Sequence, residues 1–349
     1  MTKTWMAAAL ALALAACGAP DRQAAAPAAK AGDTALQGAG ATFPAPLYAQ
    51  WSAAYNAATR VQVNYQAIGS GGGVKQIKEG TVDFGATDKP LTAEELQTAG
   101  LIQFPTVLGG VVPVINLPGV AAGQLRLTGE LLAEIYQGRI ARWNDPRLAS
   151  ANPGLALPNL PISVIHRSDG SGTTFLFSTY LASQSPAWKA SPGAGDALQW
   201  PAGIGGKGND GVAAYVKQTP GSIGYVEYSY ARANDMTPAM MRNRDGAFVA
   251  PTPAAFAVAA AKADWAAAPG FHLLLLDQPG AESWPITGAT FILLHRTRDP
   301  AKAAEAVEFF DWGYANGDAD ADRLGYVPLP GPVKDLVRAA LARDLPVPQ

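Results

Sequence analysis

Alternating runs of apolar and polar residues divide most of the chain into short strands and helices. Val61 to Tyr65 alternates with a period of two, as a strand does, and a helix over 44–57 begins at a proline. Further strands are expected at 82–86, 162–165, 222–227 and 290–295, and further helices at 72–79, 92–98, 130–137, 173–181, 211–217, 301–315 and 332–342. This alternation predicts an α/β fold with largely parallel strand pairing.

Three segments lack such a pattern. Residues 143–161 are rich in proline and asparagine, residues 191–211 are rich in glycine, and residues 232–270 show no clear periodicity. We expect loops in all three.

Three helix starts combine serine or threonine with a nearby turn. Thr42 precedes Pro44, Ser70 precedes a run of three glycines, and Ser171 lies in the turn before the helix at 173–181. Serine and threonine cap helices well, and the free N–H groups of a helix start attract anions. These three starts can form one anion site if the fold brings them together.

Arg167 follows the expected strand at 162–165 and leads into the third of these turns. Its planar guanidinium suits a tetrahedral oxyanion, and Asp169 can hold that group in place. The alternative is a well-capped helix with an Arg–Asp pair on the surface, and this stretch alone does not decide between the two.

Composition limits the classes of ligand and partner. Of the 349 residues 48% are hydrophobic and 15% are charged, which supports a sizeable core in one large or two medium domains. Lys and Arg number 26 against 28 Asp and Glu, so nothing favours nucleic-acid binding. His166, His272 and His295 are far apart and are expected to be packed or surface side chains, so we expect no metal site.

The N-terminal sequence indicates an export signal followed by a membrane-anchoring site. Residues 1–16 have a lysine followed by an apolar run, as in a signal peptide, and they lead to the single cysteine, Cys17. The sequence Leu-Ala-Ala-Cys resembles a bacterial lipobox, which implies lipidation of Cys17. Residues 17–35 then form the lipidated cysteine and a flexible Ala/Pro-rich tether. The alternative is ordinary secretory cleavage, with Cys17 left unmodified.

Seven stretches, in conserved order along the chain, carry a resemblance to a known family. They are GAGATFPAPLYAQW at 38–51, NYQAIGSGGGVKQI at 64–77, VDFGATDKPL at 82–91, QFPTVLGGVV at 103–112, HRSDGSGTTF at 166–175, GGKGNDGVAAYVKQTPGSIGYVEYSYA at 205–231 and WPITGATFILLH at 284–295. On these stretches the chain resembles the periplasmic phosphate-binding protein of phosphate ABC transporters. Residues 232–282 match that family least.

The resemblance implies the two-lobed periplasmic-binding-protein fold of type II, in which each lobe is a mixed sheet flanked by helices. Lobe 1 would comprise 36–107 and 286–349, and lobe 2 would comprise 108–285. A two-segment hinge, expected near 105–112 and 282–288, would let the lobes close on inorganic phosphate. The family also implies a monomer that works in the periplasm with an ABC permease and ATPase complex, with no cofactor.

The same resemblance implies a set of phosphate-binding residues. They are Thr42, Phe43 through its backbone N–H, Ser70, Asp88, Arg167, Ser171, Gly172 and Thr173. Asp169 and Ala41 would support them, and residues 207–211 would belong to the cleft architecture. At Gly71 the chain departs from many relatives, which carry a second serine there.

Asp88 would be the only acceptor among these donors. A carboxylate beside an anion is tolerable only if the ligand brings a proton to share, as phosphate does and fully ionised sulfate does not. The alternative is an exposed loop carboxylate before Pro90.

Other functions remain open at the level of sequence. A phosphate-ester hydrolase would need a nucleophile with a base, or two metals. A stand-alone phosphate sensor, or a related specificity for sulfate, would use the same scaffold. The glycines at 203, 205 and 208 fit a dinucleotide-binding spacing, but no strand is expected before them.

Overall fold

The computed structural model describes residues 35–345. The expected signal peptide, the lipidation at Cys17 and the tether up to residue 34 therefore lie outside the described residues. Within the described range, no helix is both long and apolar enough to cross a bilayer.

The elements alternate as expected, and each expected strand and helix is present with its ends within three residues of the prediction. The strands are β1 (Leu36–Gly40), β2 (Val63–Ala67), β3 (Phe84–Thr87), β4 (Leu101–Asn116), β5 (Arg126–Leu127), β6 (Ser163–Arg167), β7 (Ile204–Gly206), β8 (Ser222–Glu227), β9 (Thr237–Pro238), β10 (Met240–Arg242), β11 (Phe248–Val249), β12 (Thr287–His295) and β13 (Val327–Pro328). The helices are α1 (Ala45–Thr59), α2 (Ser70–Glu79), α3 (Ala93–Ala99), α4 (Gly129–Tyr136), α5 (Pro146–Ala151), α6 (Gly172–Gln184), α7 (Pro186–Ala190), α8 (Gly208–Gln218), α9 (Tyr228–Ala233), α10 (Pro253–Ala260), α11 (Pro300–Asn316), α12 (Asp318–Leu324) and α13 (Gly331–Asp344), with a 3₁₀ turn η1 (Pro269–Phe271).

The expected loops contain short elements, so the prediction of irregular structure was too broad. Helix α5 lies in 143–161 and is capped by Asp145, and β7 lies in 191–211. The region 232–270 holds β9, β10, β11, α10 and η1. Most of these elements are short, and the strands β7 and β10 owe their stability to pairing with β6 and β5, which no local pattern reveals.

The main sheet has the strand order β2-β1-β3-β12-β4-β8-β6-β7. Parallel pairing is confirmed for β2, β1 and β3 and for β8, β6 and β7. It is wrong for β12 and β4, which run antiparallel to each other and to their outer neighbours β3 and β8. The reason is that β4 carries the chain out of the first group of strands and β12 brings it back.

Strand β4 joins the two groups of strands without a break. Its residues Leu101 to Gly110 pair with β12, and Val111 to Asn116 pair with β8. The expected crossing at 105–112 is therefore part of one continuous, buried strand of 16 residues.

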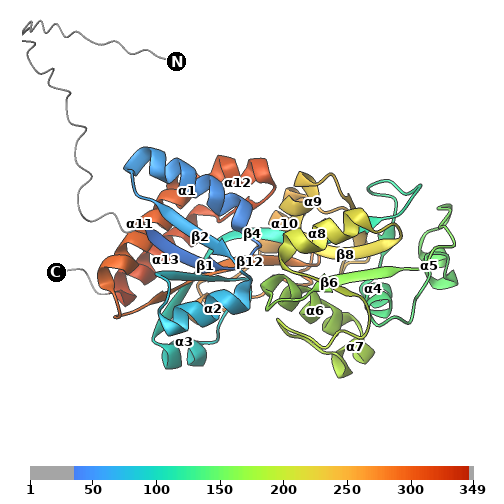
Figure 1. Cartoon of the computed structure of the whole chain (residues 1–349), viewed down its shortest axis with the longest axis horizontal. Coiled ribbons are helices and arrows are strands. Elements are labelled where there is room, and N and C mark those ends of the chain that lie inside the picture. The colour runs from blue at the N-terminus through green and yellow to red at the C-terminus, as the bar shows by residue number, and fades with distance from the viewer. Residues whose placement is uncertain (1–34, 346–349) are drawn as a thin grey trace, which may run out of the picture. The chain divides into compact units, whose positions relative to one another are not determined.

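Helices cover both faces of each group of strands (Figure 1). Around β1 and β2, α1 and α12 lie on one face and α2 and α3 on the other, while α8 and α6 lie on opposite sides of β8 and β6. Each group has its own aromatic cluster. One includes Tyr48, Tyr65, Phe84 and Phe310, and the other includes Tyr136, Phe177, Tyr225 and Trp200.

Candidate binding site

Arg167 ends β6 and lies buried, with 3% of its surface exposed. Its Nε donates to Oδ1 of Asp169 at 2.8 Å, and its Nη2 donates to Oδ2 of the same carboxylate at 2.5 Å. Its backbone N–H donates to the hydroxyl of Tyr225. The expected clamp by Asp169 is confirmed, and the alternative of a surface Arg–Asp pair is wrong.

The remaining nitrogen of this guanidinium is available for a ligand. Nη1 of Arg167 is buried and has no hydrogen-bond partner among residues 35–345. A buried donor without a partner costs free energy, and the cost is larger for a charged group such as the guanidinium of arginine. An oxyanion placed at Nη1 would remove that cost.

Ser70 is the first residue of α2, and it does not cap that helix as expected. Gly69 occupies the cap position, where its positive φ of 93° and its close approach to Asp169 and Gly170 favour glycine, and without a side chain it makes no side-chain cap bond. The Ser70 hydroxyl instead accepts hydrogen bonds from the N–H of Gly172 at 3.0 Å and the N–H of Asp88 at 3.2 Å. It therefore connects three of the expected site residues.

Thr42 does not cap α1 either, because Pro44 occupies the cap position. The Thr42 hydroxyl accepts hydrogen bonds from Asn209, at 3.2 Å from its backbone nitrogen and 2.8 Å from Nδ2. The same Nδ2 donates to Oγ1 of Thr173 at 3.3 Å. Asn209 thus joins two expected site residues. The sequence had predicted only that Asn209 belongs to the cleft architecture.

The start of α6 supplies the third helix mouth, and here the expected cap is confirmed. The Ser171 hydroxyl accepts from the N–H of Thr174 at 3.0 Å. Gly172 allows a close approach, since a Cβ at this position would lie 2.5 Å from Cβ of Asp88 and 2.6 Å from Oγ of Ser70. Only glycine lets α6 meet the end of β3 in this way.

Asp88 follows β3 and is 1% exposed, so the alternative of an exposed loop carboxylate is wrong. Its Oδ1 accepts a hydrogen bond of 2.7 Å from the hydroxyl of Thr290. Burial raises the pKa of Asp88 to about 7, although the bond from Thr290 and the positive charge of Arg167 act against this rise. The carboxyl is therefore poised between its two protonation states at neutral pH.

Three tyrosines fix the backbone of residues 41–43. The carbonyl of Ala41 accepts from the hydroxyl of Tyr65, that of Thr42 from Tyr230, and that of Phe43 from Tyr326, at 2.6 to 2.7 Å. Because these carbonyls are occupied on the core side, the turn that carries Thr42 and the Phe43 N–H is held rigidly.

All the expected site residues therefore come together at one place. We call this set the cradle; it comprises Thr42, Phe43, Ser70, Asp88, Arg167, Ser171, Gly172 and Thr173. Thr290 was not among the residues predicted from the sequence, and Asn209 was predicted only as part of the cleft architecture. A signal was present for both, because Thr290 is a polar residue inside an apolar strand and Asn209 stands at a helix start after a glycine.

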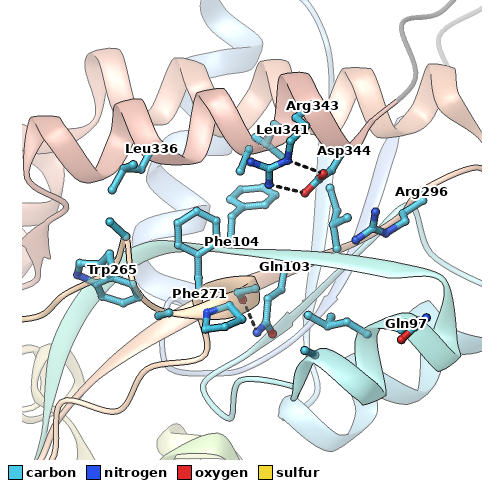
Figure 2. A pocket seen from close by; sticks show the side chains of 18 of the residues that line it. Gln97, Gln103, Phe104, Trp265, Phe271, Arg296, Leu336, Leu341, Arg343 and Asp344 are labelled. Carbon is cyan, nitrogen blue, oxygen red and sulfur yellow. Dashed lines mark hydrogen bonds and ion pairs between the residues drawn. The ribbon is translucent and has the colours of Figure 1, made fainter.

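A sizeable cavity lies elsewhere. It has a volume of about 700 Å³ and lies among α3, β4, η1 and α13, with Trp265, Phe271 and Leu341 in its wall (Figure 2). It contains no residue of the cradle. Its mostly apolar wall is unsuited to a small hydrated oxyanion, and its Arg343 is already paired with Asp344.

Among residues 35–345, no group of three or more His, Cys, Asp or Glu could hold a metal ion.

Both a family model and individual known proteins match the sequence of this chain. A family model described as a PBP superfamily domain matches residues 24–316. The phosphate-binding protein PstS of Xylella fastidiosa (strain 9a5c) is 53% identical over 296 residues, which are 84% of this chain and 81% of that relative.

Solved structures agree in fold. A phosphate binding protein from Stenotrophomonas maltophilia superimposes with a TM-score of 0.67 at 24% identity, covering 88% of this chain and 93% of that one. An ABC-type phosphate transport receptor from Vibrio cholerae gives a TM-score of 0.55 at 19% identity, covering 84% and 100%. The expected two-lobed α/β fold is thereby confirmed.

Proposed function

The chain belongs to the PBP superfamily, and on this premise we propose that it binds inorganic phosphate in the cradle and delivers it to an ABC-type import permease. The observation that carries the proposal is the buried, unpartnered Nη1 of Arg167 beside a ring of hydroxyl and N–H donors. The 53% identity to a protein named for phosphate binding supports the same ligand.

The hydroxyls of the cradle favour a ligand that accepts hydrogen bonds. A hydroxyl has one hydrogen to donate and two lone pairs. Both lone pairs of Ser70 are used by the N–H groups of Gly172 and Asp88, and its hydrogen faces two acceptors, the Asp88 carboxylate and a bound ligand. Phosphate presents oxygens that take such hydrogens.

Asp88 supplies the selectivity. Phosphate at neutral pH still carries a proton and can share it with this carboxylate, whereas sulfate cannot. A buried group built to pair with a ligand proton can reject an analogue without that proton by about 10⁴–10⁵. The raised pKa of Asp88 fits a carboxyl that shares a proton readily.

Binding would be coupled to closure of the lobes, with lobe 1 formed by 36–107 and 286–349 and lobe 2 by 108–285. Contacts between the two parts support this. The N–H of Gly71 donates to the carbonyl of Gly170 at 2.9 Å, and Lys89 pairs with Asp196 at 3.4 Å. Release would require these contacts to open around β4 and β12.

The N-terminal features support a proposal for where in the cell the protein works. Export by residues 1–16 and lipidation of Cys17 would tether the protein to a membrane in the periplasm or cell envelope. Residues 18–35 would span at most roughly 60 Å when fully extended, enough for a monomeric body to reach its permease.

Titration calorimetry on the purified protein, after removal of copurified phosphate, tests the proposal. One phosphate per chain should bind. A parallel assay with phosphate esters and added divalent metals separates a binding protein from a hydrolase, and we expect no turnover. Absence of phosphate binding, or metal-dependent ester hydrolysis, would overturn the proposal.

A further inference from the structure

We propose that Asn209 is a positioning residue that directs the hydroxyl hydrogens of Thr42 and Thr173 toward the bound anion. The inference rests on the proposed function and concerns the same site. In this proposal Asn209 does not contact the ligand itself, but it determines how the hydroxyls of Thr42 and Thr173 contact the ligand.

The orientation of the Asn209 amide is fixed by the backbone. Asn209 is the second residue of α8 and is fully buried. Its Oδ1 accepts a hydrogen bond of 3.0 Å from the N–H of Glu227, which can only donate. The other end of the amide must therefore be Nδ2, and this nitrogen faces Thr42 and Thr173.

This orientation decides what the two hydroxyls can do. Both lone pairs of Thr42 Oγ1 are taken by Asn209, one by its backbone N–H and one by Nδ2. The hydroxyl of Thr173 accepts from the second hydrogen of Nδ2. Because Nδ2 cannot accept a hydrogen, both threonines must donate theirs elsewhere, and a ligand oxygen in the cradle provides the acceptor.

Asn209 also links the ligand site to the sheet. Thr42 lies between β1 and α1, whereas Thr173 and Asn209 are the second residues of α6 and α8. Glu227 ends β8 opposite Val111, next to the residue where β4 changes partners. A displacement at this point would move the amide and with it both hydroxyls.

Asn209→Asp is the most informative variant, because the carboxylate has nearly the same shape but offers an acceptor in place of Nδ2. Both hydroxyls would then donate to the carboxylate and not to phosphate. Loss of two hydrogen bonds to an anion predicts a phosphate dissociation constant roughly 100-fold higher. Asn209→Ala leaves the hydroxyls undirected but free, and we expect a rise of only about tenfold.

The order of these two variants separates positioning from packing. If Asn209 only filled space, Ala would be worse than Asp because Ala leaves a cavity. Ala weaker in its effect than Asp supports the proposal, and the reverse order overturns it.

A double-mutant cycle removes the effect of the added charge. Thr42→Val has no hydroxyl to redirect, so in this background the penalty of Asn209→Asp should shrink at least severalfold. Repulsion between the new carboxylate and phosphate would give the same penalty in both backgrounds, and that result would overturn the proposal.

Asn152→Asp is the matched control. Asn152 is also buried, its Nδ2 donates to the carbonyls of Arg126 and Leu148, and its Oδ1 accepts from the N–H of Arg126. This change should lower the melting temperature and leave phosphate affinity unchanged.

Wild-type protein that fails to bind phosphate would refute the proposed function. Tight phosphate binding by both wild type and Asn209→Asp would refute only the inference about Asn209.

Discussion

The hydroxyl of Thr290 on β12 donates a hydrogen bond of 2.7 Å to the carboxylate of Asp88 at the end of β3. The two strands are antiparallel neighbours, and Phe291 lies opposite Thr87 in their register. The bond favours the ionised form of Asp88, while burial favours the protonated form, and the pKa of about 7 reflects the balance. This pair therefore connects the sheet topology to the chemistry of the cradle.

The ligand-free protein should lose stability as pH rises. The pKa of Asp88 increases from 3.8 to about 7 on folding, so the folded state binds more protons between these pH values. The free energy of unfolding must then fall across that range, by on the order of a few kcal/mol. Urea unfolding at a series of pH values from 4 to 8, without phosphate, measures this.

Variants divide the effect between two buried carboxyls. Burial also raises the pKa of Glu227 to about 8, with the same sign of effect. Asp88→Asn should reduce the slope between pH 3.8 and about 7, and Glu227→Gln between pH 4.5 and about 8, so that only the part above pH 7 depends on Glu227 alone. A profile unchanged by Asp88→Asn would contradict the account of that carboxyl.

Arg167→Lys should weaken phosphate binding roughly 100-fold, although the charge is kept. Arg167 binds Asp169 through two separate nitrogens and leaves a third for the ligand, whereas the donors of lysine all radiate from one nitrogen and lack this planar geometry. Calorimetric titration measures the loss.

The chain contains a matched control for this change. Arg147 pairs with Asp145 through the same two atoms, Nε and Nη2, but is exposed at the surface. Arg147→Lys should leave phosphate affinity unchanged. Equal effects of the two substitutions would show that the buried geometry of Arg167 has no special role.

Gly172→Ala should lower phosphate affinity at least tenfold, because the added Cβ would lie 2.5 Å from Cβ of Asp88 and 2.6 Å from Oγ of Ser70. Alanine is otherwise well suited to a helix start, so the clash and not the backbone carries the effect. Gly331→Ala serves as the control, since no atom lies within 4 Å of the added Cβ there. Binding by Gly172→Ala as tight as by the control would mean that α6 and β3 need not meet in the bound state.

The local part of this architecture could be predicted from the sequence. Periodicity located β6 and α6, and the turn between them placed Arg167, Asp169 and Ser171 correctly because those residues are neighbours in the chain. The cap of α6 by Ser171 is a local contact of the same kind.

The long-range part could not be predicted from local patterns. Thr42 and Ser70 look like helix caps, but their hydroxyls are taken by Asn209, Gly172 and Asp88, which lie far away in sequence. The antiparallel run of β4 and β12 depends on where the chain crosses and returns. The donor set of the cradle is thus visible in the sequence, whereas the bonds that orient it are visible only in the fold.

Titration of wild type and Asp88→Asn with phosphate and with sulfate tests the central claim most directly. The account predicts that wild type binds one phosphate and gives no sulfate signal. In Asp88→Asn, phosphate binding should weaken, sulfate binding should appear, and the ratio of the two affinities should fall at least tenfold. Equal binding of both anions by wild type, or an unchanged ratio in the variant, would contradict it.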